Sequence, residues 1–64
     1  MNPHQERVVS EKQELDQKIS KLEIFIQGSM YAGLASPEKS RLKNQLRAMQ
    51  LYSYILGERI IYFE

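Results

Sequence analysis

The chain has 64 residues, of which 27% are charged, and its formal net charge at pH 7 is +1. A chain this short forms one domain at most, and below roughly 70 to 80 residues a single core seldom supplies more than about 3 to 5 kcal/mol of net stability. Because there is no Cys and only one His, disulfides are excluded and a structural zinc site is not expected, which leaves oligomerisation as the remaining source of stability.

The first predicted element is a helix over about residues 3–27. Asn2 precedes Pro3, an N-cap residue followed by proline at the first helical position, where its missing N–H would have no partner anyway. Beyond this start, apolar residues recur at spacings of seven, four, three and four, which places them along one side of a helix: Val8, Leu15, Ile19, Leu22 and Ile26. Gly28 is expected to end the helix as a left-handed C-terminal cap.

Residues 28–36 are the predicted connection, which closes a hairpin. Three apolar side chains indicate that this segment packs against the helices: Met30, Tyr31 and Leu34. Ser36 before Pro37 repeats the N-cap signal, and Glu38 adds negative charge at a helix N-terminus, where the macrodipole favours it. A second helix is therefore predicted over about residues 37–63.

The second predicted helix carries a row in strict four-three alternation, the pattern of a seam between two helices. Its members are Leu42, Leu46, Met49, Ser53, Leu56, Ile60 and Phe63. Both helices reach about 25 residues, which at 1.5 Å per residue gives matched lengths of about 38 Å. We predict an all-α fold in which residues 1–64 form one antiparallel two-helix hairpin.

A second stripe on the same helix is offset from the seam. It consists of Ala48, Tyr52, Ile55, Arg59 and Tyr62. A two-helix hairpin covers only one stripe per helix, so the second stripe either widens the core or meets another copy of the chain. We favour another copy, because an isolated hairpin of this size buries too little area to offset chain entropy, and symmetric closure is the common solution. The predicted interface between copies consists of Tyr52, Ile55, Leu56, Ile60 and Tyr62.

The residues available for catalysis are few, because the chain has one His, no Cys and scattered carboxylates. Glu11, Glu14 and Asp16 alternate with Lys12 and Lys18 at helical distances, so surface ion pairing explains them better than an acidic site does. No zinc-protease, glycine-rich phosphate-loop or nucleophile motif is present. We expect no enzyme, no cofactor and no metal site.

The net charge of +1 gives no overall field for DNA, RNA or an anionic membrane, so any anion site must be local. No apolar run approaches the roughly 18 residues of a membrane span, and the N-terminus lacks the apolar core of a signal peptide. We therefore expect a soluble, intracellular protein that binds neither nucleic acid nor membrane.

Positive side chains recur on or beside one face of the first helix, next to its apolar row: His4, Arg7, Lys18 and Lys21. They form either a solvated flank whose stems cover the seam or a local anion site. Arg59 lies within the apolar run ILGERIIYF, where burial in an oligomer would require a carboxylate or an outside anion as partner. Glu58 and Glu64 are the carboxylates nearest to it in the sequence.

Gly57 interrupts a helical pattern at a cost of about 1 kcal/mol relative to Ala, so a packing reason is expected. Close approach of a second helix is the simpler explanation. A ligand lying against the bare backbone is the other.

Two segments resemble a known family: QERVVSEKQELDQKISKLEIFI and LKNQLRAMQLYSYILGERI. The resemblance is carried by the pair Arg7-Val8, the runs LDQKISKL and QLRAMQLYSYIL, and Arg59 in LGERI. Together they resemble the phage-encoded helical-hairpin family that contains the anti-CBASS cyclic-nucleotide sponges, which shares a related hairpin with one class of anti-Thoeris sponge. The resemblance spans about residues 5–61.

This resemblance implies a hexamer built as three dimers. It implies a protein in the cytoplasm of an infected bacterial host that sequesters cyclic dinucleotide and cyclic trinucleotide immune messengers without degrading them. Such a protein would keep the messenger from its CBASS effector.

The resemblance also implies which residues bind. Lys18 matches a lysine that contacts the phosphates of a cyclic dinucleotide, and Arg59 matches an arginine that takes part in binding nucleotides, notably cyclic trinucleotides. Ser20 falls where a small hydroxyl residue helps line the trinucleotide site. Pro3 or His4 stands where better-studied members stack a tyrosine on a base. The predicted ligand-binding set also includes Arg7, Val8, Lys21 and Leu22.

A different class of function is a small helical interaction protein. Such a protein would use Tyr52, Ile55 and Tyr62 to engage another host or phage protein, and its cations would only add solubility. The two hypotheses differ in a simple measurement, because only the sponge would be stabilised by a cyclic nucleotide.

Overall fold

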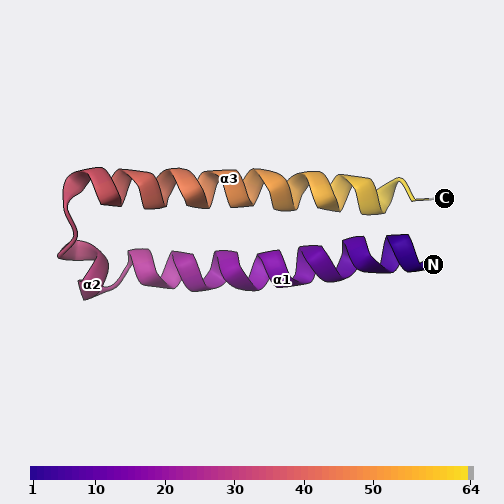
Figure 1. Cartoon of the computed structure of the whole chain (residues 1–64), viewed down its shortest axis with the longest axis horizontal. Coiled ribbons are helices and arrows are strands. Elements are labelled where there is room, and N and C mark those ends of the chain that lie inside the picture. Colours follow the sequence, from indigo (N-terminus) through magenta and orange to yellow (C-terminus); the bar gives the residue numbers. More distant parts are fainter. Residues whose placement is uncertain (64) are drawn as a thin grey trace.

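The computed structural model describes residues 1–63. It contains α1 over Pro3–Ile26, α2 over Ser29–Ala32 and α3 over Ser36–Ile61. Figure 1 shows α1 and α3 side by side in opposite directions, with α2 at the turn and both ends of the chain at the other end of the hairpin. The predicted antiparallel helical hairpin is confirmed, and its helix ends lie within one or two residues of the predicted ones.

The hairpin is elongated, with extents of 47 × 14 × 13 Å. Its radius of gyration of 14.7 Å exceeds the value of about 11 Å expected for a compact domain of this length. Its solvent-accessible surface of 4955 Å² likewise exceeds the value of about 4,200 Å² expected for a compact chain of this mass. Two helices alone therefore leave much of their surface uncovered.

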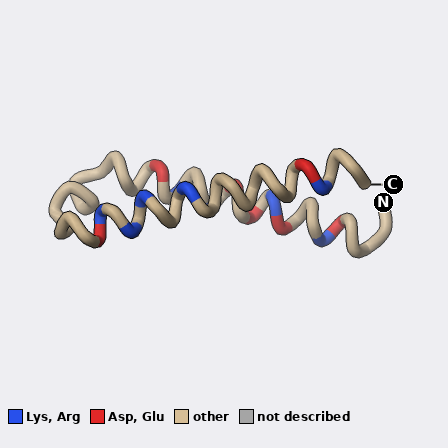
Figure 2. The backbone as a smooth tube through the Cα atoms, turned by 90° about the horizontal axis from the view of Figure 1, so that it is seen from above, with Lys and Arg blue, Asp and Glu red and all other residues tan. Residues whose placement is uncertain are grey.

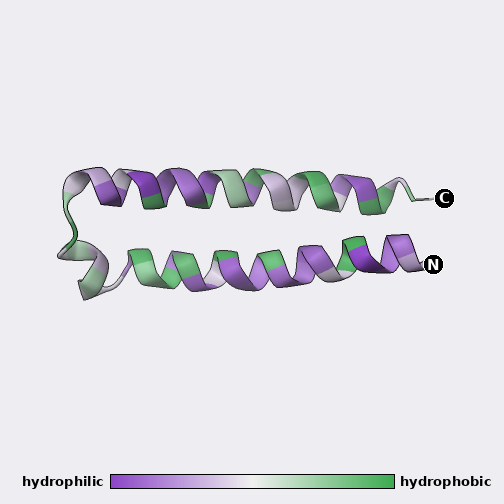
Figure 3. Ribbon diagram, viewed as in Figure 1, coloured by the Kyte–Doolittle hydropathy of each residue, from purple (hydrophilic) through white to green (hydrophobic). Residues whose placement is uncertain are grey.

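The core is one row of side chains between α1 and α3. Val8, Ile19 and Leu56 are buried there, and Leu56 is completely buried. The other apolar members of the two predicted seams are half-buried: Leu15, Leu22, Ile26, Leu42, Leu46, Met49, Ile60 and Phe63. In Figure 3 hydrophobic positions of α1 lie along the side that faces α3. Both predicted seams are thereby confirmed.

The two helix starts differ in how they are capped. At α1 the Asn2 side chain accepts a hydrogen bond from the backbone N–H of Gln5 at 2.9 Å, and the Gln5 side chain accepts one from the Asn2 N–H at 3.2 Å, which confirms the predicted N-cap. At α3 the N-cap is Ala35, so the prediction of Ser36 was wrong by one residue. Ala35 is extended and its carbonyl already accepts bonds from the next turn, and Pro37 is tolerated anywhere in a first helical turn.

The predicted left-handed cap at Gly28 is wrong. No residue from 1 to 63 has a positive φ. Gln27 ends α1 instead, and Gly28, with φ −94° and ψ 171°, is the extended N-cap of α2. The chain reverses by starting a new short helix, and this removes the need for a left-handed residue.

The turn is anchored by Tyr31. Its ring is buried and packs edge-on against Phe25, with ring centroids 6.4 Å apart. Its hydroxyl donates to the Lys39 carbonyl at 3.4 Å, and the Lys39 ammonium lies 5.7 Å from the ring centroid. The connection therefore packs against both long helices through Tyr31, and Leu34 is half-buried, as predicted, whereas Met30 is exposed, contrary to the prediction.

Candidate functional site

A hydrogen bond between the two long helices marks one side of the hairpin. The Tyr52 hydroxyl on α3 donates to the Glu11 carboxylate on α1. This bond raises the pKa of Tyr52, and the positive charge of Arg59 acts on it in the opposite direction. Arg7 and Lys18 lie one turn before and two turns after Glu11, on the same face of α1. We call this surface the Tyr52 side, because it brings the α1 cations and Arg59 to one side of the molecule.

Most of the predicted ligand-binding side chains are exposed: Pro3, His4, Arg7, Lys18, Ser20, Lys21 and Arg59. Two are not. Leu22 is half-buried, and Val8 is only 4% exposed because it packs between the helices. Val8 is thus a core residue of the hairpin, and a ligand would not reach its side chain.

These side chains do not converge within one hairpin. The contact between Lys12 and Ser53 aligns the helices, and in this alignment Lys18 and Arg59 are separated by about 15 to 18 Å along the axis. Ser20 follows Lys18 by two residues, so it projects from another face of α1. Over residues 1–63 the surface has no pocket, and His, Asp and Glu side chains form no group suited to a metal ion. A single hairpin therefore encloses no ligand.

The second stripe of α3 lies uncovered. Tyr52, Ile55 and Tyr62 are 43, 45 and 77% exposed, and Leu51 beside them is 61% exposed. Leu56 was also predicted at the interface between copies, but it is completely buried against α1 because its position belongs to the seam. Leu56 is therefore not accessible to another chain in this hairpin. Ile60 is half-buried, so part of its side chain remains accessible.

Charge is distributed unevenly along the hairpin. Figure 2 shows that positive positions dominate in the half near α2 and negative positions in the half near the termini. The half near α2 carries Lys18, Lys21, Lys39, Arg41, Lys43 and Arg47, against Glu23 and Glu38. Within residues 1–63 Arg59 makes no ion pair, and Glu64, one of its two predicted neighbours, lies outside the described residues. No described helix combines the length and apolarity that crossing a membrane requires.

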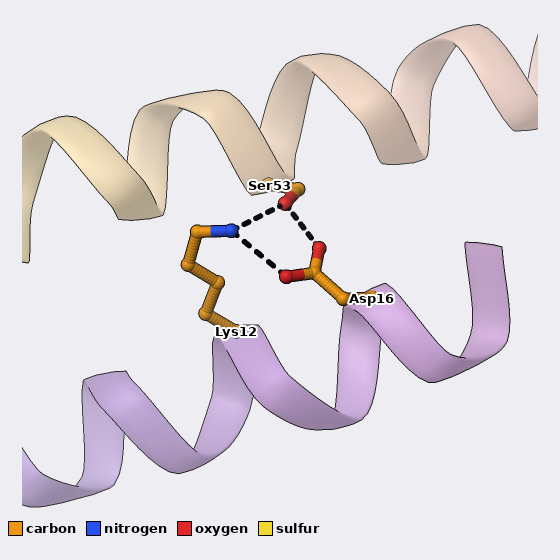
Figure 4. Close-up of polar contacts among 3 residues, drawn as sticks. All are labelled: Lys12, Asp16 and Ser53. Atoms are coloured by element: carbon orange, nitrogen blue, oxygen red, sulfur yellow. Dashed lines mark hydrogen bonds and ion pairs between the residues drawn. The ribbon is translucent and has the colours of Figure 1, made fainter. Parts of the chain in front are cut away.

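A polar layer interrupts the apolar seam (Figure 4). The Lys12 ammonium donates to the Asp16 carboxylate at 2.8 Å, which confirms a predicted ion pair, and to the Ser53 hydroxyl across the seam at 3.1 Å. Ser53, only 8% exposed, donates its own proton to Asp16. Over residues 1–63 every buried side-chain nitrogen and oxygen has a hydrogen-bond partner, so the layer is fully satisfied.

Gly57 lies one turn after Ser53 and faces the stem of Lys12. A Cβ atom built at Gly57 would be 3.2 Å from the Lys12 Cε, closer than an ordinary contact. The packing reason expected for this glycine is therefore present, and the neighbour is a side chain of α1 in the same chain.

The polar layer predicts a pH dependence. The hydrogen bond from Lys12, with a second from Ser53, lowers the pKa of Asp16, so the charged carboxylate favours folding. Replacing Asp16→Asn should lower the free energy of unfolding at pH 7 by at most about 1 kcal/mol, because the pair is half-exposed and solvent screens it. The difference in unfolding free energy from wild type should shrink as the pH falls below about 4 and vanish below the lowered pKa of Asp16, because the wild-type carboxyl is then protonated as well. Urea unfolding at pH 7 and at pH 2.5 measures this difference.

Glu14→Gln is the matched control, since it removes the same charge from an exposed position of α1. This variant should stay within about 0.5 kcal/mol of wild type at pH 7. An Asp16→Asn deficit that persists unchanged at pH 2.5 would contradict the assignment.

The polar layer is the feature that the sequence patterns missed. The apolar row of the first helix skips from Val8 to Leu15, and Lys12 occupies the seam position between them. Ser53 is likewise the polar member of the seam on the second helix. The signal that could have revealed the layer was one polar residue in each apolar seam, at positions that face each other when the two helices pair antiparallel.

The chain matches the family described as Sequestin over residues 2–62. No curated protein and no solved structure matches it. Because the match spans nearly the whole hairpin, including the polar layer, the cations and the second stripe, the chain belongs to the Sequestin family.

Proposed function

We propose that this chain is a phage anti-defence protein that binds and sequesters cyclic dinucleotide and cyclic trinucleotide immune messengers without cleaving them. Membership of a family named Sequestin supports a sequestering role. The resemblance to the anti-CBASS sponges supports the choice of ligand. The observation that carries the proposal is the Tyr52 side, where α1 cations and Arg59 flank an apolar stripe that the hairpin itself does not cover.

Assembly explains how so small a chain would form a ligand site. One hairpin has no pocket and keeps Lys18 and Arg59 apart, so the site would form only where copies meet through Tyr52, Ile55 and Tyr62. Burial of these side chains would also supply the stability that the thin core lacks. We propose a homo-oligomer, as a hexamer of three dimers.

The symmetry of the ligand fits such an assembly. A cyclic dinucleotide carries two phosphates related by an approximate two-fold axis, and a two-fold dimer presents every cation twice. The two Lys18 side chains of such a dimer, one from each chain, then face the two phosphates. Charge-assisted hydrogen bonds contribute about 1.5 to 3 kcal/mol each, and stacking on a base adds roughly 1 to 3 kcal/mol. Four such contacts support sub-micromolar binding after the cost of association.

Retention of an intact messenger tests the proposal. The purified oligomer is incubated with cyclic di- and trinucleotides, washed, and heated to release what it holds. We expect the released nucleotide to have the mass of the intact ring. A linear product would identify an enzyme, and no retained nucleotide would reject the sponge.

The exposed second stripe favours one alternative, a helical module that binds another protein through Tyr52, Ile55 and Tyr62. Thermal unfolding separates the two functions. A cyclic nucleotide at one hundred times its dissociation constant adds about 2.7 kcal/mol of stability to a sponge. The interaction module would show no shift with any cyclic nucleotide.

A further inference from the structure

Within residues 1–63, directional contacts hold α1 and α3 at two points along the hairpin. At the turn, Tyr31 bonds the Lys39 carbonyl and packs on Phe25. At the other point, Lys12 and Asp16 on α1 both bond Ser53 on α3, and next to them Tyr52 on α3 bonds Glu11 on α1. Ser53 follows Lys39 by fourteen residues, so the two points are about 21 Å apart along α3. The polar layer is therefore the part-buried directional link of the half in which both chain ends lie, whereas the Tyr52–Glu11 bond beside it is exposed to solvent.

Apolar contacts in that half do not define one alignment. A seam with a seven-residue repeat presents similar apolar surfaces after a slide of one repeat, about 10 Å, and van der Waals contacts alone distinguish such alignments weakly. A polar side chain in a seam does distinguish them, because a slide leaves it facing apolar neighbours without a partner. Here a slide would remove Ser53 from Lys12 and bring an apolar seam residue in its place.

The lysine is also fixed in rotation. Its ammonium bonds Asp16 on its own helix and Ser53 on the other, while its stem lies against the bare backbone of Gly57. With 30% of its side chain exposed, Lys12 is less accessible than the exposed Lys18 and Lys21 on the same helix. Its contacts with Ser53 and Gly57 favour one position of α1 against α3.

We propose that Lys12 is a positioning residue: with Asp16 and Ser53 it sets the register of α1 against α3, and so places Arg7 and Arg59 for the assembly of the ligand site. The effect on ligand binding rests on the proposed function, whereas the effect of Lys12 on helix register does not. This role separates Lys12 from the other α1 cations, since its ammonium serves the hairpin and does not touch the messenger. The half-buried Gly57 then has a structural role, because the absence of a side chain there leaves room for the lysine stem.

The test replaces all three members of the layer by apolar residues of similar volume, Lys12→Leu, Asp16→Ala and Ser53→Ala, in the full chain. Because exchange of even a fully buried ion pair for well-packed apolar residues is neutral or stabilising, we expect an unchanged or higher melting temperature for this half-exposed one. Affinity for a cyclic dinucleotide should nevertheless fall at least tenfold in isothermal titration. Amide NMR spectra should show several sets of signals for residues near the termini, where wild type shows one.

The matched control is Lys43→Leu with Glu14→Ala and Ser40→Ala, which removes a lysine, a carboxylate and a serine from exposed positions and should leave affinity and spectra unchanged. Wild-type affinity and a single set of signals in the layer variant would overturn the inference. If the layer variant unfolds, Ser53→Ala alone decides, because several sets of amide signals would support the inference and a single set would overturn it. If wild type binds no cyclic nucleotide, the proposed function fails while the spectra still test the register.

Discussion

Leu56→Ala should lower the melting temperature of the protein by at least about 10 °C, the largest effect of any single core substitution. Leu56 is completely buried in the one row of side chains that joins α1 and α3. A buried Leu→Ala change costs about 2 to 5 kcal/mol, while the core of so short a chain supplies only about 3 to 5 kcal/mol. The variant should therefore lose most of what holds the hairpin together, as measured by circular dichroism during heating.

Ile24→Ala is the control for this measurement, because Ile24 is 70% exposed on α1. Its melting temperature should stay within a few degrees of wild type, since surface substitutions usually change stability by less than about 0.5 kcal/mol. If Leu56→Ala melted like Ile24→Ala, the thin core would not be the main source of hairpin stability.

Lys18→Ala should weaken cyclic dinucleotide binding at least 100-fold while leaving the mass of the oligomer unchanged. Within residues 1–63 the exposed ammonium of Lys18 has no ion pair or hydrogen bond, so its removal disturbs no contact of the hairpin. In a two-fold site each substitution removes two charge-assisted contacts of about 1.5 to 3 kcal/mol each, and every 1.4 kcal/mol is tenfold in affinity. Isothermal titration measures the loss directly.

Lys43→Ala provides the matched control, because it removes the same charge from an exposed position of α3 away from the Tyr52 side. It should bind within about twofold of wild type, the difference expected from long-range charge screened by salt. Equal affinities of the Lys18→Ala and wild-type proteins would remove Lys18 from the site. A general loss in both lysine variants would indicate net charge as the cause.

The long elements were predictable because they depend on repeating signals. Apolar spacing along each helix places Ile19 and Leu56 in one seam, and the capping box at Asn2 starts α1 where the sequence indicates. The turn was less predictable, because its path depends on tertiary contacts. Burial of Tyr31 holds α2 in place, and Gly28 then serves as an extended N-cap instead of a left-handed C-cap.

The sequence predicted which residues one chain contributes to the candidate site, but not how the site is completed. Exposure of Lys18 and Arg59 agrees with a binding role, but their separation along the hairpin means that a second chain must complete the site. Lys12 shows the opposite case. By composition it is one more cation of the first helix, and only its contacts with Ser53 and Asp16 distinguish it from a ligand residue.

Stoichiometry and mass, measured on the same sample, test most directly whether identical hairpins together create the binding site. Light scattering should give a mass of two or more 7.5 kDa chains. Titration of the same sample with a cyclic dinucleotide should give one ligand bound per two chains. A monomer at micromolar concentration, or one ligand bound by each separate chain, would contradict a site shared between copies.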